Sequence, residues 1–145
     1  MKKILKWAVL TVTSVVLVFP VLAGQVQPAI VDVDLDNFFA SGDLISARTA
    51  KNDDVFIGCG TRNFELGDGS LFSNAFCQAE DEDGDRVVCF TTNPELVRTI
   101  RGINDSSYVT FSWNDDGDGN LTCTRMGFST QSFYLGKDTK GNKVK

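Results

Sequence analysis

Residues 71–91 read LFSNAFCQAEDEDGDRVVCFT, and this stretch decides the fold. Two runs rich in apolar residues, 71–79 and 86–91, flank an acidic turn that contains Asp83 and Gly84. Asp-Gly between two apolar runs is a strong short-range signal for a β-hairpin. We therefore predict two antiparallel strands that pair across residues 80–85.

The segment that follows predicts a helix and then a second hairpin. Asn93 suits a helix N-cap, Pro94 suits the first helical position, and Gly102 offers the left-handed residue that ends many helices. Residues 108–113 and 121–128 have the aromatic and β-branched content of strands, and a second acidic Asp-Gly turn separates them. A helix between two hairpins is therefore expected.

The N-terminal part contributes one clear strand pattern. Residues 31–36 alternate Val or Leu with Asp, which predicts an outer strand with its acidic side in water. The expected fold class is α+β: a small, mostly antiparallel β-sheet domain of five or six strands with one helix, stapled by two disulfides. We expect an N-terminal strand and linker over 24–52, a disulfide-stabilised β-rich domain over 53–136, and a flexible basic tail over 137–145.

The chain has four cysteines, Cys59, Cys77, Cys89 and Cys123. Their spacing contains no C-x-x-C, so neither a zinc ribbon nor a thioredoxin-type redox motif is indicated. Cys77 and Cys89 mirror each other across the first predicted hairpin. We therefore expect the pairs Cys77–Cys89 and Cys59–Cys123, out of the three pairings that four cysteines allow.

The first 23 residues have the layout of a secretory signal peptide. Three Lys lie within the first six residues, an apolar run follows over 7–19, and small residues stand before a cleavage point after Ala23. The run is shorter than the roughly 20 residues of a membrane span. We expect cleavage, no stable membrane anchor afterwards, and a secreted or periplasmic protein whose cysteines oxidise.

Charge and composition exclude several classes of function. Loss of residues 1–23 removes three Lys and shifts the net charge from −5 to −8. Such a surface repels phosphate backbones, so we expect no nucleic-acid partner. The chain has no His, which removes the usual general base and the Ser-His and Cys-His pairs. We therefore expect no catalytic residues and no enzyme; a hydrolase that uses carboxylates alone is the remaining enzymatic alternative.

The second acidic turn is a candidate calcium site formed by Asn114, Asp116, Asp118 and Asn120. The first three resemble positions 1, 3 and 5 of an EF-hand loop. Position 12 is Arg125 in place of the bidentate Glu, so a solvated turn without any cofactor is the expectation and calcium is the alternative.

Aromatic residues offer a second candidate surface, although core packing is the expected use of most of them. The set is Phe64, Phe72, Phe76, Phe90, Phe111, Trp113, Phe128 and Phe133. From these observations we predict a non-enzymatic binding or interaction protein, inhibitor-like or effector-like, with a protein or glycan ligand. A calcium-dependent extracellular structural or adhesion module is the alternative.

Overall fold

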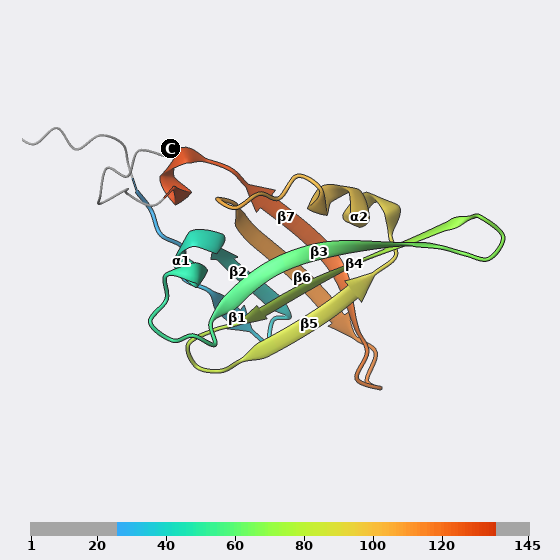
Figure 1. Cartoon of the computed structure of the whole chain (residues 1–145). Coiled ribbons are helices and arrows are strands. Elements are labelled where there is room, and N and C mark those ends of the chain that lie inside the picture. Colours follow the sequence, from blue (N-terminus) through green and yellow to red (C-terminus); the bar gives the residue numbers. More distant parts are fainter. Residues whose placement is uncertain (1–25, 136–145) are drawn as a thin grey trace, which may run out of the picture.

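The structure, a computed structural model, describes residues 26–135 (Figure 1). The expected signal peptide and basic tail lie outside these residues. The elements in chain order are β1 Asp32–Asp34, β2 Phe39–Asp43, α1 Leu44–Arg48, β3 Phe56–Glu65, β4 Leu71–Glu80, β5 Arg86–Thr91, α2 Pro94–Ile100, β6 Tyr108–Asp115, β7 Leu121–Ser129 and a 3-10 turn at Ser132–Tyr134.

Seven strands form one sheet in the order β1-β2-β6-β7-β5-β4-β3. All neighbours pair antiparallel except β5 and β7, which pair parallel. The mostly antiparallel sheet and both predicted hairpins are thus confirmed. The sheet has more strands than expected, and a second helix, α1, accompanies α2. The extra elements, β2 and α1, are short, so neither is long enough to show a periodic pattern in the sequence.

The N-terminal residues belong to this same sheet. β1 is an edge strand, as its acidic side predicted, with Val31 and Val33 buried. Leu35 is exposed, because β1 ends at Asp34 and the chain turns there, with the Asn37 amide donating to the Asp34 carboxylate. β2 leads directly into α1, whose N-cap, Asp43, is buried.

The sheet curls until its two halves face each other. In Figure 1, β3, β4 and β5 cross in front of β2, β6 and β7, and contacts join β2 to β3 and β1 to β4. The side chains between the halves form the core. Its fully buried members are Ala40, Ala75, Cys77, Ala79, Cys89, Val109 and Phe111.

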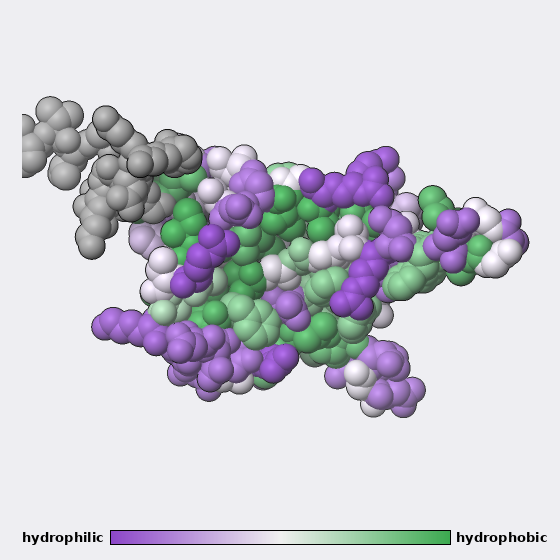
Figure 2. All heavy atoms as spheres, viewed as in Figure 1, coloured by the Kyte–Doolittle hydropathy of each residue, from purple (hydrophilic) through white to green (hydrophobic). Residues whose placement is uncertain are grey.

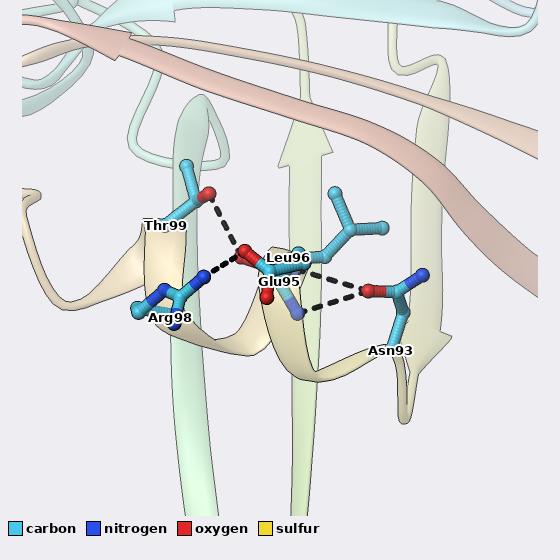
Figure 3. A network of polar contacts seen from close by, with 5 residues as sticks. All are labelled: Asn93, Glu95, Leu96, Arg98 and Thr99. Atoms are coloured by element: carbon cyan, nitrogen blue, oxygen red, sulfur yellow. Dashed lines mark hydrogen bonds and ion pairs between the residues drawn. The ribbon is translucent and has the colours of Figure 1, made fainter.

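Helix α2 forms where the sequence predicted it. The Asn93 side-chain oxygen accepts hydrogen bonds from the Glu95 and Leu96 amides (Figure 3), and Pro94 occupies the first turn. Val97 and Ile100 point into the core. This agreement reflects capping, which depends on adjacent residues alone.

The prediction that Gly102 ends α2 in a left-handed conformation is wrong. The glycines with positive φ are at turns elsewhere in the chain, and the C-cap is Arg101 in right-handed helical geometry. Gly102 serves packing instead. A Cβ there would lie 2.3 Å from Cζ of Phe128.

The structure pairs Cys59 with Cys77 and Cys89 with Cys123, so the predicted disulfide pairing is wrong. The four cysteines come from four adjacent strands, β3, β4, β5 and β7. Cys77 stands directly opposite both Cys59 and Cys89. Its local position was therefore compatible with either partner.

The spacing of the strands excludes the predicted pairs. A Cys77–Cys89 bond would leave Cys59 and Cys123 three strand spacings apart, roughly 14 Å, beyond the roughly 7 Å that a disulfide spans. In addition, a strand residue points its backbone groups at one neighbour only. The 4.0 Å Cα separation of Cys59 and Cys77 marks a close, non-hydrogen-bonded pair, so the backbone groups of Cys77 point toward β5. Cys77 and Cys89 therefore form a hydrogen-bonded pair, whose Cα atoms lie farther apart.

Replacing Gly102 by Ala should lower the free energy of unfolding by about 1–3 kcal/mol, because the added methyl group meets the Phe128 ring. Gly67→Ala is the matched control, since no atom lies within 4 Å of its Cβ position. Urea unfolding measures both. Equal stability of the two variants would contradict this role of Gly102.

Candidate functional site

The β3–β4 hairpin extends beyond the body of the sheet. β4 pairs with β5 only between Ala75 and Glu80, whereas its pairing with β3 continues to Glu65–Leu71. We call residues 62–74, which lie past the end of β5, the arm. Figure 1 shows the arm projecting to the right of α2.

The arm concentrates large apolar side chains in water. Their exposed fractions are Leu71 73%, Leu66 49%, Phe64 46% and Phe72 43%. Figure 2 shows green side chains at its surface. The rings of Phe64 and Phe72 lie side by side across the hairpin, with centroids 6.3 Å apart. Clusters of this kind on a soluble protein typically mark interaction sites.

The aromatic surface continues from the arm over the outer face of β3, β4 and β5. Phe76 and Phe90 lie 6.3 Å apart on neighbouring strands, and the Arg62 guanidinium sits 5.1 Å from the Phe76 ring centroid. Phe76 covers Gly60, where a Cβ would lie 2.7 Å from the ring. This face is thus aromatic with one stacked cation.

The structure therefore divides the predicted aromatic set. Phe111 and Trp113 belong to the core, whereas Phe64, Phe72 and Phe90 are exposed. A signal for this division existed in the sequence. Along β3 and β4 every Phe has an even number, whereas the small residues of β4 that face the core have odd numbers.

A groove of about 500 Å³ lies between the arm and α2. Its apolar lining comes from both elements, and α2 adds two cations. The lining residues are Leu71, Phe72, Ser73, Thr92, Pro94, Val97, Arg98 and Arg101. Arg98 forms an ion pair with Glu95 on the same helix (Figure 3). No ion pair within residues 26–135 involves Arg101.

Of the four candidate calcium ligands, Asp116 is occupied by hydrogen bonds within its own turn. The Asp116 carboxylate accepts from the Asp118 amide and from both the backbone and side-chain amides of Asn120. These bonds, the side-chain bond from Asn120 foremost, hold the pKa of the Asp116 carboxyl below its usual value. Gly117 and Gly119 adopt positive φ. This is the geometry of a turn whose Asp side chains hydrogen-bond to the turn's own backbone.

A second acidic region lies at the β1 edge. Asp32, Asp34 and Asp36 line an open cavity of about 430 Å³ together with three Asp of the β4–β5 turn. Asp81 is buried there, and its carboxylate accepts from the Val33, Asp83 and Asp85 amides. Across the described part of the chain, no group of three or more Asp, Glu, His or Cys is arranged to hold a metal.

Comparison with known proteins finds no matching family model, curated protein or solved structure. Two disulfides place the folded chain in an oxidising environment, extracellular or periplasmic. Between residues 26 and 135, no helix is both long and apolar enough to cross a membrane. The site must therefore be judged by its own geometry.

Millimolar calcium should leave the thermal midpoint unchanged, because the Asp116 oxygens already bond within the turn. Extracellular calcium modules bind in this concentration range, and ligand binding raises the midpoint. Differential scanning calorimetry with and without calcium measures it. A rise that Asp116→Asn abolishes would restore the calcium site.

Proposed function

We propose that this chain is a secreted or periplasmic, non-enzymatic binding protein, inhibitor-like or effector-like, whose arm docks on a partner protein. The observation that carries the proposal is the group of four exposed apolar side chains on one projecting hairpin. In a monomer they contribute little to stability. Each is already partly buried, so its burial in a complex contributes less than the ~1.5–3 kcal/mol gained by a fully exposed side chain.

A disulfide anchors the base of the arm, which favours binding. The Cys59–Cys77 disulfide links β3 and β4 at the base of the arm, two registered pairs before Thr61–Ala75. A segment fixed in its binding conformation loses less conformational entropy on association. Protein inhibitors commonly use such preorganised loops.

A protein partner fits the arm better than a glycan. Sugars stack on aromatic faces, and Phe64 and Phe72 offer two. Leu66 and Leu71 are aliphatic and at least as exposed as the two Phe, and such side chains fit apolar pockets of a protein surface. The mixture of ring and aliphatic groups therefore favours a protein surface.

Substitution of the arm should weaken capture of the partner. We expect the mature domain to retain a specific protein from the culture fluid of its source, identified by mass spectrometry. The variant Phe64→Ser with Leu71→Ser should bind the purified partner at least tenfold more weakly, because two apolar contacts are lost.

The matched control is Ile30→Ser with Leu35→Ser, which removes two exposed apolar side chains away from the arm. It should bind as the unsubstituted domain does. Full retention by the arm variant, or loss with the control variant instead, would contradict the proposal.

A further inference from the structure

The backbone of the arm has free hydrogen-bonding groups on the side of the groove. The Leu66 amide donates to the Ser70 carbonyl at 2.8 Å, so the hydrogen-bonded pairs between β3 and β4 fall at even-numbered residues. Leu71 and Ser73 stand in the alternate pairs. Their N–H and C=O groups therefore point away from β3.

β5 stops before it reaches these groups. The Asp81 amide donates to the Asp85 carbonyl, which places the odd-numbered groups of β4 on the β5 side. That pairing ends at Ala75–Thr91, after which the chain turns into the Asn93 cap of α2. Leu71 and Ser73 thus present an unpaired strand edge along the groove wall.

The opposite wall of the groove, formed by α2, carries positive charge, which is scarce on this acidic protein. Residues 26–135 hold 18 of the 19 acidic residues of the chain but only 7 of its 14 basic ones. Arg98 and Arg101 both line the groove, and Arg98 already has Glu95 as partner. Arg101 is exposed and is the cation best placed to meet an incoming carboxylate.

We propose that an extended segment of the partner protein, bearing carboxylate side chains, adds as a short strand beside Leu71 and Ser73. The amides of these two residues donate to its carbonyls, and their carbonyls accept from its amides. Alternate side chains of the added strand then face α2, where their carboxylates meet Arg101. This inference rests on the proposed function and names the chemistry of the partner.

The other edges of the sheet are less suited to this role. At β1, the Val33 amide donates to the buried Asp81 carboxylate at 3.1 Å, which protects that edge. The outer edge of β3 presents the backbone groups of Thr61 and Asn63. No described groove borders Asn63, so it serves as the internal control.

The test uses a labelled peptide, acetyl-Glu-Val-Asp-Val-Glu-amide, and a counterpart in which Lys replaces each acidic residue, acetyl-Lys-Val-Lys-Val-Lys-amide. Fluorescence anisotropy measures affinity, and amide chemical shifts locate the site. We expect the acidic peptide to shift the Leu71 and Ser73 amides and to bind at least tenfold more tightly than the lysine peptide.

Two variants separate the two strand edges. Ser73→Pro removes an N–H that β3 does not use and should weaken binding of the acidic peptide at least tenfold. Asn63→Pro removes the equivalent N–H of the outer β3 edge and should change binding less than twofold. Arg101→Glu, on an exposed helix end, should weaken binding tenfold without disturbing the strands.

Shifts at Thr61 and Asn63 instead, or equal affinity for both peptides, would overturn the inference, as would full binding by Arg101→Glu. If Ser73→Pro fails to fold, an acidic peptide with N-methylated backbone amides replaces it, and undiminished binding of that peptide is also contradictory. Capture through Phe64 and Leu71 that survives Arg101→Glu would refute strand addition and leave the proposed function standing.

Discussion

The Cys89–Cys123 disulfide is the covalent link on which the curled sheet depends. It joins β5 to β7, the one parallel neighbour pair, which has a single registered contact at Phe90–Thr122. Every other neighbour pair shares at least three registered residues. This seam divides the sheet into β1-β2-β6-β7 and β5-β4-β3. The disulfide therefore compensates for hydrogen bonds that the seam lacks.

Closure of the seam determines the other features of the molecule. The small inner side chains of β4 share one buried cluster with Val109 and Phe111 of β6, so a core forms with few large residues from β3, β4 and β5. The same requirement for small inner residues leaves the aromatic side chains of β3, β4 and β5 on the outer face. β5 then leaves the sheet for α2, which frees the far end of β4. The exposed arm and its groove are consequences of this arrangement.

Local features of the fold were predictable from the sequence, and long-range ones were not. The hairpin at 71–91 and the Asn93-Pro94 helix start depend on neighbouring residues, and both are confirmed. The parallel pairing of β5 with β7 depends on the path of residues 92–120, so the partner of Cys89 was beyond local reasoning. Of the candidate site, the even-numbered Phe periodicity pointed to an aromatic face. The groove requires α2 and β4 to be placed together, which periodicity does not encode.

Native-state amide hydrogen exchange tests the role of the seam most directly. Two double variants are compared, Cys89→Ala with Cys123→Ala and Cys59→Ala with Cys77→Ala. We predict that loss of the first disulfide sharply lowers protection in both β5 and β7, whereas loss of the second lowers protection mainly in the arm. Equal protection of β5 and β7 in the two variants would contradict the account.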